Sequence, residues 1–137
     1  MISLSHVSLE SRETGTFILN DVTWHVEEDS KWILFGRNGS GKTRLLEIIT
    51  GYSYPTTGSV VRFGEGQPGC DIRDVRERIG YVSTPLRERM YRGESILDII
   101  LSGMYGSTAL FDEPGENLRC AALDLLHETG LGGREKD

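Results

Sequence analysis

The sequence contains few cysteines and no surplus of positive charge. Only two of its 137 residues are cysteine, Cys70 and Cys120, and they stand far apart with no metal-ligand spacing. This cysteine usage predicts two reduced thiols rather than a disulfide framework or a zinc site.

The formal net charge of -6 excludes a general electrostatic attraction to nucleic acid or anionic lipid, so we expect no nucleic-acid partner.

The sequence also lacks a long hydrophobic run. Its longest apolar stretch, near Ile96–Met104, is interrupted by Asp98, Ser102 and Gly103 and falls short of the roughly 20 residues that span a bilayer. The opening residues MISLSHVSLE have no basic region followed by an apolar one, so we predict no signal peptide. If the protein acts at a membrane, another subunit is expected to span it.

Apolar periodicity predicts a mixture of strands and helices in an ordinary globular chain, of which 37% of the residues are hydrophobic and 26% charged. The predicted strands are 2–9, with a shift in phase near His6, then 17–19 and 22–26 separated by a turn at 20–21, then 58–64. Residues 31–35 and 79–82 are continuous apolar runs, typical of strands buried on both faces. The predicted helices are 43–50, ending at Gly51, 72–78, capped by Asp71, and two with apolar stripes at 96–104 and 118–126.

A glycine-rich loop follows the first of these apolar runs. Residues 36–43, GRNGSGKT, match the phosphate-binding pattern G-x-x-x-x-G-K-[ST] without a mismatch. The predicted phosphate-binding residues are Gly36, Arg37, Asn38, Gly39, Ser40, Gly41, Lys42 and Thr43. Glycines let successive backbone N–H groups point toward phosphate oxygens, and the following helix adds the positive end of its dipole.

The two residues that end the loop supply the remaining groups. Lys42 carries a point charge for the outer phosphates, and the Thr43 hydroxyl is placed to ligate Mg²⁺. The motif also lies between an apolar run and an amphipathic helix, which is the context that a phosphate loop requires. We therefore predict a site for a nucleoside triphosphate with magnesium, and ATP is the expected nucleotide.

The residues around the loop resemble the ATP-binding cassette (ABC) ATPases. The likeness extends from ILNDVTWHVEEDSKWILFG through GRNGSGKT to RLLEIITGYSYPTTGSV, and it covers most of residues 1–86. It implies an α/β fold with a P-loop NTPase core and an antiparallel β subdomain, followed by a truncated helical subdomain. Residues 1–137 would be one partial domain, with the core in 1–86 and the helical subdomain starting in 87–137.

The same resemblance implies a function and partners. Proteins of this family bind ATP and couple its hydrolysis to transport across a membrane, working with a transmembrane permease subunit and a second ATP-binding domain. This predicts a cytoplasmic protein peripheral to the cell membrane. The family's signature and Walker B segments have no room before Asp137, so we expect the chain to bind MgATP but to hydrolyse it poorly.

Two positions depart from the family pattern. The aromatic residue that stacks on adenine is expected near Arg12, whose guanidinium is also flat enough to stack, and Phe17 is a displaced candidate; a solvated surface role for Arg12 stays open. In the family a glutamine contacts magnesium where IGYVST has Thr84, and this hydroxyl would reach the metal only through water. The V-S-x-x-L pattern here is similar to the molybdenum-transport-type ATPases.

The segment ALFDEPGENL, 109–118, imitates a Walker B motif. Asp112 would then orient magnesium and Glu113 would activate water. The apolar run before Asp112 is thin for a central strand, however, and its distance from the signature-like LSGMYG is too short. We favour the alternative in which Asp112 caps a helix whose first turn is acidic.

Two other functional classes remain open. One is a regulatory nucleotide-binding module with no role in transport, which the short length and Thr84 favour. The other is a phosphate-loop kinase of small metabolites, for which residues 87–92 would have to act as a basic lid. The mixed charge of that segment is more typical of a solvated loop.

Overall fold

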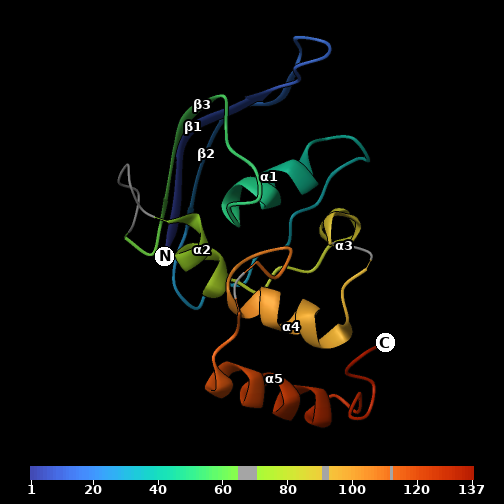
Figure 1. Cartoon of the computed structure of the whole chain (residues 1–137). Helices are drawn as coiled ribbons and strands as arrows, with labels where there is room; N and C mark the ends of the chain where they lie inside the picture. The colour runs from blue at the N-terminus through green and yellow to red at the C-terminus, as the bar shows by residue number, and fades with distance from the viewer. Residues whose placement is uncertain (65–70, 91–92, 112) are drawn as a thin grey trace. The chain divides into compact units, whose positions relative to one another are not determined.

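A computed structural model describes residues 1–64, 71–90, 93–111 and 113–137 (Figure 1). The chain divides into two compact units, Met1–Asp71 and Ile72–Asp137. The first unit holds β1 (Ile2–Glu10), β2 (Phe17–Val26), α1 (Lys42–Ile49) and β3 (Thr57–Arg62). The second holds α2 (Ile72–Glu77), α3 (Thr84–Arg89), α4 (Ile96–Met104) and α5 (Glu116–Glu128). The division predicted after residue 86, between the core and the helical subdomain, stays a prediction.

The first unit is built on a three-stranded antiparallel sheet in the order β2-β1-β3. Leu4 pairs with Trp24 on one side and with Val60 on the other, and the register then shifts before Val7. His6 lies at this shift with a φ of +52°, which breaks the alternation of side chains along the strand. The predicted change of phase near His6 is therefore confirmed.

The second strand is continuous, which corrects one prediction. Phe17–Val26 is a single strand rather than two segments separated by a turn at 20–21. Asp21 does have a positive φ of +51°, but its N–H donates to Ser8 Oγ at 2.9 Å and the strand resumes its pairing at Val22. The turn-forming residues produce a local irregularity because pairing with β1 continues on both sides of it.

Helix α1 packs on this sheet and forms the core of the unit. Leu45, Ile48 and Ile49 are the buried residues of the helix that contact the sheet. From the sheet side the buried residues are Leu4, Val7 and Leu19. The helix ends as predicted, because the next residue after its C-cap Thr50 is Gly51 with a φ of +80°.

Two predicted strands are wrong. Residues 31–35 and 79–82 have no strand structure, and Ile33, Phe35 and Val82 are 93%, 95% and 98% exposed. An apolar run predicts burial, but a strand also needs neighbouring strands to bond with its backbone. The described part of the chain forms a sheet only from β1, β2 and β3, so these two runs have no partner strand there.

The second unit is helical, and its core lies between α4 and α5. Leu97 and Leu101 of α4 pack with Ala122 and Leu126 of α5, which confirms the two predicted apolar stripes. Helix α4 begins with a capping box in which the Ser95 hydroxyl accepts from the Asp98 N–H at 3.2 Å. Among the described residues no helix is both long and apolar enough to cross a bilayer.

The start of α5 corrects another prediction. The helix begins at Glu116 with Gly115 at the N-cap position, so a cap at Asp112 is wrong. Asp112 itself lies outside the described residues, as do Cys70 and two residues of the predicted lid, 91–92. Cys120 is an exposed free thiol on α5.

Candidate functional site

The glycine-rich loop leads directly into α1 and depends on two left-handed glycines. Gly39 has a φ of +81° and Gly41 a φ of +86°. A Cβ added at Gly41 would lie 2.8 Å both from the carbonyl oxygen of Ile18 and from Leu19 Cδ2, so only glycine fits there. These close contacts with β2 seat the loop against the sheet at the point where α1 begins.

Lys42 closes the loop on itself. Its ammonium Nζ donates to the carbonyl oxygens of Gly36 and Arg37, each at 2.7 Å, and lies 3.5 Å from Ser40 Oγ. These bonds draw the first residues of the loop toward the start of the helix. The positive charge is thereby positioned at the loop, where it stays accessible to solvent.

The start of α1 offers unoccupied donors in the same place. Gly41 is the N-cap residue and no side chain caps the first turn, so no side-chain acceptor occupies the N–H groups there. A cavity of about 440 Å³ opens over this turn. It is lined by Ile18, Asn38, Gly39, Ser40, Gly41, Lys42, Thr43 and Arg44. Free N–H groups at a helix start, the positive end of the helix dipole and a lysine are the groups with which proteins commonly bind anions.

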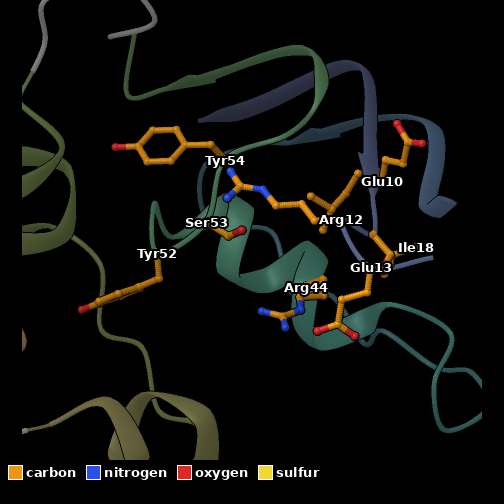
Figure 2. Close-up of a pocket in the computed structure, with 10 residues that line it drawn as sticks. Glu10, Arg12, Glu13, Ile18, Arg44, Tyr52, Ser53 and Tyr54 are labelled. Atoms are coloured by element: carbon orange, nitrogen blue, oxygen red, sulfur yellow. The ribbon is translucent and has the colours of Figure 1, made fainter. Parts of the chain in front are cut away.

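A second cavity of about 540 Å³ adjoins the first, because Ile18 and Arg44 line both (Figure 2). Arg12 also lines it, on the turn between β1 and β2, and is exposed. Phe17, the other predicted stacking residue, is 57% exposed and is not among the described residues that line either cavity.

The sequence analysis missed two aromatic residues of this second cavity. Tyr52 and Tyr54 line it from the connection between α1 and β3 (Figure 2). The only sequence signal was the presence of two tyrosines close behind the phosphate-loop helix. Arg44 was also overlooked, although it follows the motif directly; its Nη1 lies 2.7 Å from Oε2 of Glu47, a carboxylate that is only 1% exposed.

The remaining predicted site residues lie in the second unit. Thr84 is the first residue of α3, and Ser83 caps that helix by accepting from the Leu86 N–H at 3.1 Å. Glu113 is exposed, and residues 109–111 before it form no strand. The roles predicted for Thr84 toward magnesium, and for Glu113 and Asp112 in catalysis, stay predictions.

Comparison with known proteins identifies the protein family. The family model described as "ABC transporter" matches residues 19–133. The ABC transporter ATP-binding protein YlmA of Bacillus subtilis, itself uncharacterized, is 37% identical over 95% of this chain and 49% of its own length. The ABC transporter ATP-binding protein ModF of Escherichia coli is 30% identical over 88% of this chain and 25% of its own.

A solved structure supports the same fold. The ATP-binding cassette MJ0796, in a dimeric post-hydrolysis state bound to ADP and Pi, superposes with a TM-score of 0.71 and 22% identity. The match covers 99% of this chain and 60% of that one. The chain also spans about half of the length of YlmA.

The phosphate loop and the fold together define a P-loop nucleotide-binding protein with a mixed α/β structure. The chain belongs to the ABC transporter family, and the relatives it matches are the ATP-binding proteins of that family. The predicted family and fold class are therefore confirmed.

Proposed function

We propose that this chain binds MgATP at its phosphate loop, as the nucleotide-binding part of an ABC-type ATPase that couples hydrolysis to transport across a membrane. The observation that carries the proposal is the Lys42 ammonium held 2.7 Å from the Gly36 and Arg37 carbonyls, beside the uncapped first turn of α1. When a triphosphate enters, its oxygens can accept from the ammonium and from the loop N–H groups together. The polyphosphate tail is thus the part of the nucleotide that this loop is suited to hold.

Magnesium would be held chiefly by the nucleotide rather than by a protein cage. In the described residues no group of three or more histidine, cysteine, aspartate or glutamate side chains is placed to hold a metal ion. Thr43 is exposed and lines the cavity over the first turn of α1, and hydroxyl oxygens suit Mg²⁺ as ligands. Thr43 would supply one ligand, with phosphate oxygens and water completing the shell, and the ion would neutralise charge on the phosphates.

The transport function requires partners that we also propose. These are a transmembrane permease subunit and a second ATP-binding domain, which would place the protein in the cytoplasm, peripheral to the cell membrane. The dimeric state of the MJ0796 cassette supports the second domain, and the names of the relatives support a transporter.

Binding of ATP with magnesium, measured by calorimetry, tests the proposal. We expect Lys42→Ala to weaken the affinity about 10-fold or more, because charged hydrogen bonds to phosphate are lost. Lys31→Ala is the matched control, since Lys31 is exposed and precedes the loop, and it should leave the affinity within about twofold. Equal affinities for the wild type and both variants would contradict the proposal.

A regulatory module that binds nucleotide without driving transport is the second candidate function. The observation that favours it is Thr84, at the position where the family's glutamine would meet magnesium. Purification from membranes separates the two functions. A permease that co-purifies with the chain supports transport, whereas a soluble chain that binds ATP without one supports regulation.

A further inference from the structure

A run of exposed apolar residues connects β2 with the phosphate loop. Residues 31–35 read KWILF, and each of them is exposed. Ile33 is 93% exposed and Phe35 95%, although apolar side chains of this size are usually buried. Contiguous exposed apolar residues, unlike single ones, mark surfaces that bind another molecule.

The backbone of this run is extended, and within the described residues it makes no hydrogen bond. Residues 31–37 contain neither a turn nor a bend. Among the parts of the chain that the structure describes, none bonds through its backbone to the N–H or C=O groups of 31–35. An extended segment with unpaired backbone groups is a template for a further strand. The run therefore suits an extended polypeptide that supplies its own N–H and C=O groups alongside.

The start of the run is held in place by the sheet. The rings of Trp32 and Trp24 lie edge to face with their centroids 5.4 Å apart, and Trp24 packs against the core of the first unit. The Trp32 Nε1 donates to Ser30 Oγ at 3.0 Å, and that hydroxyl donates to the Glu27 carbonyl at 2.7 Å. Because the run starts from a fixed position, less conformational entropy is lost when a second strand binds it.

Charges of opposite sign lie at the two ends of the run. Glu27, Glu28 and Asp29 precede it, Arg37 follows it, and these four residues are exposed. A copy of the run in the same direction would bring like charges together at each end, which is unfavourable. A copy in the opposite direction brings opposite charges together at both ends. The charges therefore favour a second copy of this chain, placed antiparallel.

The spacing of these charges selects one register. Asp29 lies four residues before Ile33, and Arg37 lies four residues after it. Opposing residues of an antiparallel pair are equally distant from its centre. A pair centred on Ile33 therefore places Asp29 of each copy opposite Arg37 of the other. Two ion pairs, related by a two-fold axis, would then lie just beyond the ends of the ladder.

The apolar residues also find suitable neighbours in this register. Ile33 lies beside its own copy, and Trp32 lies opposite Leu34 on the other face, because alternate residues of a strand point to opposite faces. Phe35 lies opposite Lys31, whose aliphatic stem and ammonium can cover an aromatic ring. Aromatic and β-branched cross-strand pairs stabilise antiparallel ladders.

We propose that two copies of this chain associate through residues 31–35, which form an antiparallel ladder centred on Ile33. This interface lies outside the phosphate cavity and does not depend on nucleotide binding. A ladder of five residues is small, and small interfaces give weak, transient association. We therefore expect a monomer–dimer equilibrium with a dissociation constant in roughly the micromolar range.

Reversing the charges at the two ends tests the register. Asp29→Lys and Arg37→Asp should each weaken self-association about 10-fold, because either change places like charges opposite each other twice in the dimer. An equal mixture of the two variants should regain the wild-type dissociation constant within about threefold, since every pair in the mixed dimer has opposite signs. Sedimentation velocity over a range of concentrations measures all of these constants.

Two controls accompany the charge reversals. Residue 29 has a φ of +59°, which strains a lysine, but this strain is the same in the mixed dimer and in the dimer of the Asp29→Lys variant. Asp124→Lys, on the exposed surface of α5, changes the net charge by the same amount and should leave self-association within about twofold of the wild type.

Disulfide cross-linking tests the same register independently. In a chain with Cys70 and Cys120 replaced by serine, Ile33→Cys should form dimers under mild oxidation, because the Cβ atoms of opposing residues lie about 4.5–5.5 Å apart. Phe35→Cys alone should cross-link at least about fivefold less, since residue 35 lies opposite residue 31. Mixed with Lys31→Cys, it should cross-link efficiently.

Each outcome counts for or against the ladder. Association that each charge reversal weakens and the mixture restores, with preferential cross-linking at residue 33, supports the proposal. If the mixture restores nothing, or if residues 33 and 35 cross-link equally, the association is nonspecific and the proposal is overturned. A wild-type chain that stays monomeric up to roughly millimolar concentration also overturns it and leaves the run to a different polypeptide. None of these results changes the expectation for ATP binding.

Discussion

The guanidinium of Arg62 on β3 donates from Nε to the carbonyl oxygen of Ile49 at 2.6 Å, and its Nη2 bonds to the carbonyl of Ile48. Arg62 is only 7% exposed, so it satisfies the last carbonyls of α1 inside the protein. A cation at this end of the helix also interacts favourably with the helix dipole. One residue of the sheet thereby stabilises the C-terminal end of α1, the helix whose N-terminal end we propose as the phosphate site.

Replacing Arg62 by methionine should lower the stability of the protein. We expect Arg62→Met to reduce the free energy of unfolding by about 1.5–3 kcal/mol, because two buried carbonyls lose a charged donor. Urea denaturation followed by circular dichroism measures this change. Arg134→Met, at an exposed ion pair with Asp137, is the control and should change stability by less than about 1 kcal/mol. Similar losses in the two variants would show that the bonds of Arg62 contribute nothing specific.

Two glycines of the loop should respond differently to the same substitution. Gly39→Ala meets no atom within 4 Å, so its cost should be limited to the strain of a positive φ, about 1 kcal/mol. Gly41→Ala adds a clash at 2.8 Å with the Ile18 carbonyl and should be more destabilising, with a larger loss of phosphate affinity. Thermal unfolding and tripolyphosphate binding measure both. If Gly41→Ala cost no more than Gly39→Ala, the close contact between Gly41 and β2 would be contradicted.

The exposed apolar run at 31–35 should contribute to association rather than to stability. Ile33→Ser is expected to change the free energy of unfolding by no more than about 0.5 kcal/mol, because the side chain is 93% exposed. It should also reduce self-association in sedimentation velocity, since exposed apolar patches promote it. Ile48→Ala, on the buried face of α1, should instead cost about 2–5 kcal/mol. If Ile33→Ser proved as costly as Ile48→Ala, residue 33 would have to be buried in solution.

Features encoded by neighbouring residues could be predicted from the sequence. The phosphate loop follows from a contiguous motif, and helices α1 and α4 follow from local apolar periods. The capping box of α4 was not predicted. The strand predicted at 31–35 failed because pairing depends on which other strands are present, and apolar composition carries no such information. The prediction of where α5 starts was wrong for a local reason, because Gly115 and not Asp112 is the N-cap residue.

The second cavity could not be predicted from the sequence for a different reason. Arg12 and Tyr54 are separated by the whole of β2, the phosphate loop and α1, and only the fold brings their segments to one cavity. Arg12 was identified because a family pattern marks its position. No comparable pattern marks Tyr54, so its place in the cavity emerged only with the fold.

The backbone amides of residues 39–43 provide the most direct test of the claim that the loop holds a polyphosphate through its own N–H groups. Amide resonances of the ¹⁵N-labelled chain would be followed by NMR during titration with tripolyphosphate and magnesium. We predict that the largest shifts fall on residues 39–43, that they saturate together, and that Lys42→Ala weakens the response. Shifts confined to other segments, or no shift in a folded sample at millimolar ligand, would contradict the claim.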